Sequence, residues 1–126
     1  MLDIQKMQEN VNSFHYWDSR IHEISTLYFG DEVVIRMEET KMQDLVLTFL
    51  GCDRVEMQHW FGYPKFGSPT REKNNKHLPY YAQDISVHSE EHAGEQYYVF
   101  DLDLHPMYMK VFCRDLEVGI VDTKEN

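Results

Sequence analysis

Glycine and cysteine are scarce in this chain of 126 residues, which has six glycines and two cysteines. The glycines form neither GxGxxG nor GxxxxGK(S/T), so the glycine-rich loops that bind phosphate groups are excluded. No GxSxG, HExxH or CxxC motif occurs either. Cys52 and Cys113 lie far apart in the sequence, which favours two free thiols in a reducing compartment over a disulfide. We therefore expect no cofactor.

Long hydrophobic runs are also missing. No segment reaches the roughly 18 consecutive apolar residues that a membrane-spanning helix needs. Asp3, Lys6 and Glu9 interrupt residues 1–12, so no secretion signal is expected there. These absences predict a cytoplasmic protein that has no membrane partner.

Basic residues are few, since 12 Lys and Arg stand against 22 Asp and Glu and the formal net charge is -10. This charge repels phosphate backbones, so a nucleic-acid partner is not expected. The imbalance is uneven along the chain. Residues 61–79 carry four basic residues and one acidic residue, which gives a local charge of +3 (Lys65, Arg71, Lys73 and Lys76 against Glu72). The chain therefore combines an acidic body with one basic segment.

The composition is that of a folded protein, with 42% hydrophobic and 13% aromatic residues. A chain of this length suits one domain with one core, and we expect a single domain over residues 1–126. It divides into a short helix at 1–12, the first strands at 14–60, a long basic and aromatic loop at 61–82, and the last strands at 83–121.

Apolar and polar residues alternate along much of the chain, as is typical of antiparallel strands with one solvated face. Val33, Ile35 and Met37 share one face of such a strand, and residues 108–121 are expected to form one further strand. Helices long enough for a parallel α/β fold are missing. We predict a mainly β fold, an antiparallel six- to seven-stranded sandwich or partly open barrel with a short N-terminal helix.

The stretch FHYWDSRIH, residues 14–22, contains the three residue types of a serine-protease triad. His15, Asp18 and Ser19 lie within five residues, however, and an extended backbone sends neighbouring side chains to opposite faces. We expect a structural role instead. Asp18 or Ser19 would bond nearby backbone groups where the chain enters its first strand, and Trp17 would pack on the core.

Three segments carry a family resemblance: FHYWDSRIHEI at 14–24, DLVLTFLGCDRVEM at 44–57 and MKVFCRDLEVGIV at 109–121. Together they resemble a group of small bacterial β-proteins that begin with a His/Trp-Asp-Ser-x-Ile motif. Some of these are similar to immunity proteins encoded beside polymorphic toxins. The residue before Asp-Ser is usually His in that group, and here it is Trp17. The resemblance implies an inhibitor that binds a toxin.

His88, Glu90 and His92 follow one another at every second residue, so an extended strand would place all three on one face. A divalent metal could then reach them, as in a metal-dependent hydrolase. The alternative is a polar strand end in front of the turn at Ala93 and Gly94. With no further ligand motif in the chain, we expect no metal site.

The segment from residue 60 to residue 81 mixes aromatic and basic side chains. Trp, Tyr and Arg are enriched where proteins bind one another, and long loops often carry function. It could therefore bind a ligand or a partner, or it could simply be pinned to the domain by its aromatic rings. The candidate site residues here are Trp60, Tyr63, Lys65, Arg71 and Tyr80.

The function that best fits these observations is that of a non-enzymatic intracellular binding protein, an immunity-type inhibitor that occludes a basic toxin through an acidic surface. Outward-facing acids on the strands would supply the negative electrostatic field that attracts the toxin: Glu32, Glu38, Glu39, Asp101 and Asp103. Exposed sheet edges would also permit a homodimer. The alternative is a small-ligand-binding β-barrel in which Phe49, Tyr98 and Phe100 line a cavity.

Overall fold

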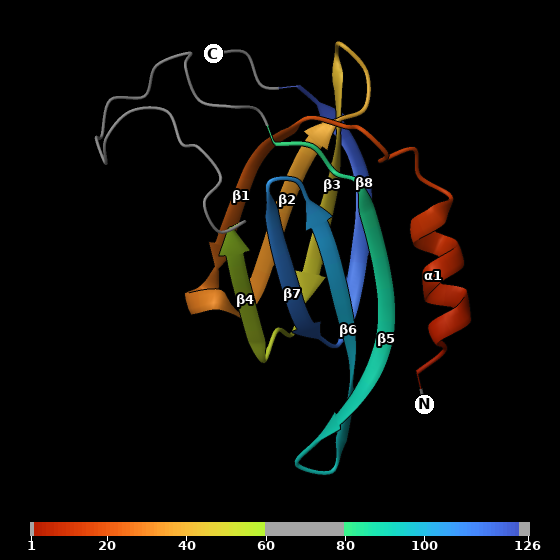
Figure 1. Ribbon diagram of the computed structural model, residues 1–126, viewed down its shortest axis with the longest axis vertical. Helices are drawn as coiled ribbons and strands as arrows, with labels where there is room; N and C mark the ends of the chain where they lie inside the picture. Colours follow the sequence, from red (N-terminus) through yellow and green to blue (C-terminus); the bar gives the residue numbers. More distant parts are fainter. Residues whose placement is uncertain (1, 60–79, 124–126) are drawn as a thin grey trace.

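The computed structural model describes residues 2–59 and 80–123 and places them in one α-helix and eight strands (Figure 1). One short 3-10 turn, η1 (Tyr28–Gly30), joins the first two strands. The elements are α1 (Ile4–Asn12), β1 (Ile21–Leu27), β2 (Glu32–Glu38), β3 (Gln43–Leu50), β4 (Arg54–His59), β5 (Asp84–His92), β6 (Glu95–Leu104), β7 (Met107–Cys113) and β8 (Asp115–Asp122).

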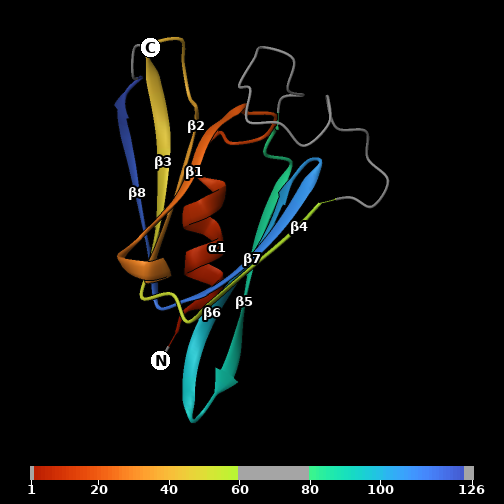
Figure 2. The same ribbon diagram turned by 90° about the vertical axis from the view of Figure 1, so that its left-hand side faces the viewer.

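The strands form two antiparallel sheets of four strands each. Their orders are β1-β2-β3-β8 and β4-β7-β6-β5, and Figure 2 shows the two sheets as separate layers. The predicted mainly β sandwich with a short N-terminal helix is confirmed. The arrangement is not a closed barrel, and the described residues hold one strand more than the upper limit predicted.

The additional strand arises because residues 107–122 do not form one strand. β7 belongs to one sheet and β8 to the other, so the prediction of a single strand over 108–121 was wrong. The alternation itself changes phase at this point. Met109, Val111 and Cys113 point into the core at odd positions, whereas Leu116 and Val118 do so at even positions. The phase shift lets the chain leave one sheet at Arg114 and continue in the other.

The two points where the chain changes sheet, after β3 and after β7, lie side by side. The amide of Arg114 donates to the Leu50 carbonyl at 2.9 Å. Gly51 adopts a φ of +63°, and a Cβ there would lie 3.3 Å from the Arg114 side chain. Glycine therefore suits this position in two ways, because it tolerates a positive φ and leaves room for the arginine.

The inward side chains of both sheets share one core. Val33, Ile35 and Met37 are fully buried, as the alternation predicted. Across the sandwich, the rings of Phe49 and Phe100 meet edge to face with centroids 5.0 Å apart. Because alternate side chains along β2, β3, β6 and β7 enter this core, the residues between them must lie on the outer faces.

Helix α1 covers the edge strand β5 (Figure 1). Asp3 caps its start by accepting a hydrogen bond from the Lys6 amide at 3.0 Å. The side-chain amide of Gln8 donates to the Ile85 carbonyl at 2.9 Å and accepts from the Val87 amide at 2.8 Å. It thus satisfies the backbone groups at the outer edge of β5 that a neighbouring strand would otherwise pair with. Within the part of the chain that the structure describes, no helix is both long and apolar enough to span a bilayer.

Cys52 and Cys113 carry free thiols, as expected. Burial raises the pKa of Cys52 to about 11 and that of Cys113 to about 12. Both groups are therefore protonated at neutral pH, and a protonated thiol is neither nucleophilic nor a metal ligand.

A buried ion pair lies on the outer face of the β1-β2-β3-β8 sheet. Arg36 of β2 donates to one carboxylate oxygen of Asp44 through Nε at 3.2 Å and Nη2 at 2.9 Å, and both residues are buried. The other oxygen of Asp44 accepts from the Thr123 hydroxyl at 2.9 Å. The outward Arg36 is thus not a solvated surface charge but part of a cluster that ties β2 to β3 and to the chain beyond β8.

We predict that Asp44→Asn lowers the free energy of unfolding by about 3 kcal/mol, because it leaves the Arg36 charge buried without its partner. Urea unfolding at neutral pH measures this loss. The matched control is Glu117→Gln on the exposed part of the same face, for which the change should stay within about 0.5 kcal/mol. Equal effects of the two substitutions would contradict the structural role of the pair.

Candidate partner-binding groove

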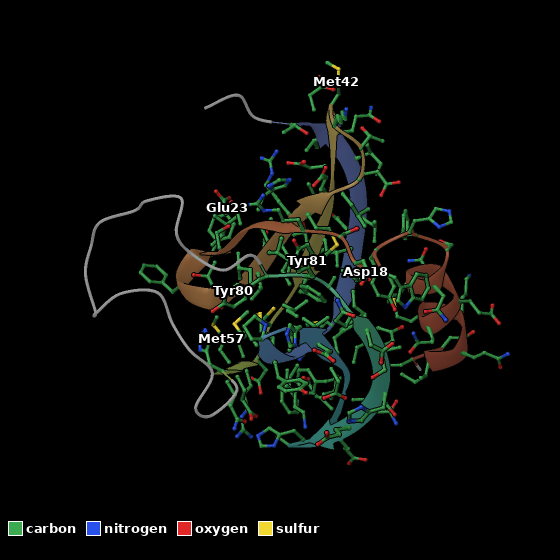
Figure 3. All side chains as sticks on the ribbon, turned by 45° about the horizontal axis from the view of Figure 1, so that its top comes forward. Asp18, Glu23, Met42, Met57, Tyr80 and Tyr81 are labelled. Atoms are coloured by element: carbon green, nitrogen blue, oxygen red, sulfur yellow. The ribbon has the colours of Figure 1, made fainter. Side chains whose placement is uncertain are left out.

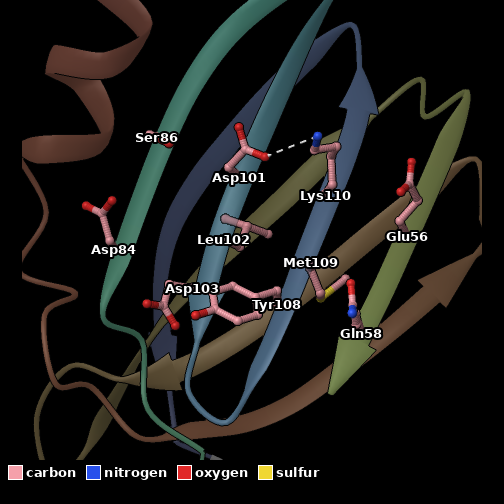
Figure 4. A pocket seen from close by; sticks show the side chains of 10 residues that line it. All are labelled: Glu56, Gln58, Asp84, Ser86, Asp101, Leu102, Asp103, Tyr108, Met109 and Lys110. Atoms are coloured by element: carbon pink, nitrogen blue, oxygen red, sulfur yellow. Dashed lines mark ion pairs between the residues drawn. The ribbon is translucent and has the colours of Figure 1, made fainter. Parts of the chain in front are cut away.

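The outer face of the β4-β7-β6-β5 sheet contains a groove of about 400 Å³ (Figure 4). Its floor and walls come from all four strands of that sheet. The polar residues that line it are Glu56, Gln58, Asp84, Ser86, Asp101, Asp103, Tyr108 and Lys110.

These residues come from four strands and meet because of the strand register. One row across the sheet runs from Glu56 through Lys110 and Asp101 to Ser86. The neighbouring row consists of Gln58, Tyr108, Asp103 and Asp84. Since alternate residues of a strand share a face, the inward packing of the residues between them aims both rows at solvent.

The groove carries an excess of negative charge. Four carboxylates stand against the single ammonium of Lys110, which leaves a lining charge of -3. Lys110 Nζ lies 3.7 Å from Asp101, whose other carboxylate oxygen lies 3.1 Å from His88 Nδ1. One carboxylate oxygen of Asp103 is buried and has no hydrogen-bond partner among the described residues. The groove is therefore suited to accept hydrogen bonds from positively charged donors.

The structure separates the five acids that we expected to act together. Asp101 and Asp103 lie in the groove, whereas Glu32 and Glu38 lie on β2, on the outer face of the other sheet. Glu38 and Glu39 line a second hollow of about 420 Å³ at the end of β2, which they share with the segments that precede β1 and β5. The outer faces of a sandwich point away from each other (Figure 2), so the acids do not form one continuous surface.

The other two groove carboxylates, Glu56 and Asp84, were missed at the level of sequence. Each stands next to an inward-facing residue, Val55 and Ile85 respectively. That alternation marks both acids as outward, but it does not tell which outward residues of different strands are neighbours. The neighbours depend on strand order and register.

The family comparison gives a match to the model of immunity protein PIM7 over residues 3–120. The chain belongs to this family. No curated protein matches it. The match includes α1 and almost all of the eight strands, so every residue that lines the groove lies within the matched region. The resemblance to immunity proteins of polymorphic toxins is confirmed.

The metal-ligand candidates of this PIM7-family chain do not converge on one point. His88 contacts Glu90 through Nε2 at 2.9 Å and Asp101 through Nδ1 at 3.1 Å. His92 lies four residues further along β5, and four residues of a strand span about 13 Å. Within residues 2–59 and 80–123, no group of three or more His, Cys, Asp or Glu side chains could hold a metal ion.

The opening motif has a structural role in the PIM7-family fold, but the tryptophan is not where we expected it. Trp17 is half exposed and stacks on Tyr16 with ring centroids 4.2 Å apart, and Tyr16 occupies the core position. Burial raises the pKa of the Tyr16 hydroxyl, which accepts a hydrogen bond from the Ile85 amide at 3.1 Å. The backbone of this segment turns sharply, so Tyr16 points inward and its neighbour outward.

Asp18 and Ser19 fasten this segment to the chain in front of β5. Asp18, which Figure 3 labels, has a φ of +63°. Its amide donates to the Ala82 carbonyl at 2.7 Å, and its carboxylate accepts from the Gln83 side chain at 3.1 Å. Ser19 donates to the carbonyl of His15 at 3.3 Å. The local bond of Ser19 to the backbone agrees with the expectation, whereas Asp18 makes a long-range contact.

Tyr80 is the only residue of the aromatic and basic loop candidates that the structure describes. Its carbonyl accepts from the Ile21 amide at 2.8 Å, and its ring meets His59 edge to face at 6.0 Å. The other four candidates, Trp60, Tyr63, Lys65 and Arg71, lie outside the described residues.

The small-ligand barrel alternative does not fit the PIM7-family structure. Its cavity required one closed sheet, and the strands form two separate sheets. Phe49 and Phe100 are fully buried and in contact with each other, and Tyr98 packs beside them. These rings fill the space between the sheets as core residues.

We predict that Asp18→Ala lowers the free energy of unfolding by about 1 to 2 kcal/mol, because it removes the bond to Gln83 and places alanine at a positive φ. Thermal unfolding followed by circular dichroism measures the loss. Asp18→Asn keeps the acceptor oxygen and tolerates the backbone conformation, so it should remain close to wild type. A destabilised Asn variant together with a stable Ala variant would contradict this role.

Proposed function

We propose that this chain is a non-enzymatic immunity-type inhibitor that binds a protein toxin in the groove of the β4-β7-β6-β5 sheet. The observation that carries the proposal is the set of four carboxylates in that groove, on a chain of an immunity protein family. The partner surface that fits the groove is basic, with Arg or Lys side chains in its centre. Inhibition follows by occlusion, since the bound chain covers the toxin surface that it contacts.

The chemistry of the groove supports a charged partner. Asp84 and Asp101 lie on neighbouring rows of the two adjacent strands β5 and β6, so a guanidinium entering the groove meets carboxylates on more than one side. Bonds between a guanidinium and a carboxylate are about twice as strong as neutral ones. The net charge of -10 adds a long-range attraction that speeds the encounter with a basic protein.

The groove is a better binding surface than the acidic face of the other sheet. On that sheet, Asp44 is already neutralised by Arg36, and the hollow beside Glu38 and Glu39 also contains Arg20. The groove is lined by four carboxylates and one ammonium group, whereas three carboxylates and one guanidinium line that hollow. The groove therefore carries the larger excess of negative charge, -3 against -2.

Location and assembly form part of the same proposal. We place the inhibitor in the cytoplasm, where two unpaired thiols are ordinary. A homodimer stays a prediction that rests on exposed sheet edges alone.

The test measures binding of the purified toxin domain encoded beside this chain, by isothermal titration calorimetry. The triple variant Asp84→Asn, Asp101→Asn, Asp103→Asn keeps the shape of the groove and removes three charges. We predict that it binds at least 30-fold more weakly, since losing one partner of an interfacial charge pair costs about 2 to 5 kcal/mol. Its melting temperature should not fall, because Asp84 and Asp101 contribute little to folding as solvent-accessible charges and Asp103 loses a charge whose buried oxygen has no partner among the described residues.

The matched control removes three acids from the opposite face: Glu23→Gln, Glu38→Gln and Glu117→Gln. It should bind within threefold of wild type. Weaker binding of the control together with unchanged binding of the groove variant would move the site to the other sheet. If the wild-type chain does not bind the toxin domain at all, the proposed function is wrong.

A further inference from the structure

The turn between β1 and β2 exposes three consecutive large apolar side chains. Phe29 is fully exposed at 110%, Tyr28 is 67% exposed and Leu27 is 45% exposed. Exposed single hydrophobic residues are common, but three in a row at the tip of a hairpin present a continuous apolar surface to solvent. We refer to Leu27, Tyr28 and Phe29 as the aromatic tip.

The backbone of the aromatic tip is also unfavourable for the residues that occupy it. Tyr28 has a φ of +54° and Phe29 a φ of +61°, and Gly30 follows at +95°. Side chains with a Cβ rarely adopt this left-handed region, and hairpin turns of this kind ordinarily use Asn, Asp or Gly. Two aromatic residues thus occupy positions where both solvent exposure and backbone conformation disfavour them. Such strain is typical of binding and active sites.

The tip is held firmly in this conformation. The Asp31 amide donates to the Tyr28 carbonyl at 3.1 Å, and the Cys52 amide donates to the Asp31 carbonyl at 2.8 Å. Below the tip, β1 and β2 pair up to Leu27 and Glu32. A turn whose backbone is already fixed loses little backbone entropy when it binds, which favours its exposed aromatic residues as anchors at a protein interface.

The charges around the tip specify the chemistry of the surface that it fits. Asp31 and Glu32 follow the tip after Gly30, and Asp53 stands next to Cys52, whose amide is bonded to the turn. The turn is thus apolar at its centre and acidic at its base. Cys52, which contacts the turn, lies two residues before the start of β4. Glu56 of β4 lines the groove, so the tip and the groove adjoin the same strand.

We propose that the aromatic tip is a second contact with the toxin, in which Phe29 and Tyr28 enter an apolar pocket rimmed by basic side chains. This inference rests on the proposed inhibitor function and adds a hydrophobic anchor to it. The groove supplies charge recognition, and the tip supplies burial of apolar area that water otherwise covers.

The deciding variant is Phe29→Asn, because it changes binding and folding in opposite directions. Asn adopts the left-handed conformation more readily than Phe, so the melting temperature should be unchanged or higher. Affinity for the purified toxin domain encoded beside this chain should fall at least tenfold in calorimetric titration. Phe29→Trp, which keeps a large aromatic side chain, should retain affinity within threefold.

The matched control is Met42→Ser in the turn between β2 and β3. Met42 is 76% exposed, but it lies at the other end of β2 (Figure 3). Its replacement should leave affinity within twofold of wild type. If the toxin binds Phe29→Asn as tightly as wild type, the aromatic tip is not a contact, while the proposed function stands. If the wild-type chain does not bind the toxin, both proposals are overturned.

Discussion

The structure depends on the burial of the inward side chains between the two sheets. This burial fixes the register of every strand pair, because a slip by one residue would turn the apolar side chains outward. The register in turn decides which outward residues become neighbours. Glu56, Lys110 and Asp101 meet on the outer face because Val55, Val111 and Phe100 pack on the inner one. The candidate site is thus a consequence of the core.

The two sheets are joined where the chain changes layer. Gly51 and Arg114 lie against each other at this point, and Arg114 also stacks over the ring of Tyr97 at 5.0 Å. Its guanidinium pairs with Glu95, which lowers the pKa of that carboxyl group. Where the chain passes between the sheets, Gly51 leaves space that the Arg114 side chain occupies. This contact holds the end of β3 in one sheet against the end of β7 in the other.

Much of the fold could be predicted from the sequence, because alternation reports directly on which residues are buried. Val33, Ile35 and Met37 are examples. The change of phase between Cys113 and Leu116 was also present in the sequence, but an alternation pattern does not state that the two halves belong to different sheets. The strand order was needed for that.

The candidate site was predictable only in part, for the same reason. Asp101 and Asp103 were recognised as outward acids, yet their neighbours Glu56 and Asp84 come from other strands. The buried pair of Arg36 and Asp44 depends on register in the same way, because the two residues belong to different strands. Trp17 was misplaced because the sharp turn at Asp18 interrupts the alternation there, and Tyr16 takes the inward position.

The most direct test of the central claim is site-specific photo-crosslinking to the purified toxin domain. A photoreactive benzoyl-phenylalanine replaces Ser86, which lies in the groove, or Thr48, which lies on the outer face of the other sheet. The account predicts a covalent complex with the toxin from position 86 and none from position 48. Crosslinking from position 48 alone would contradict it, because the toxin would then lie on the face opposite the groove.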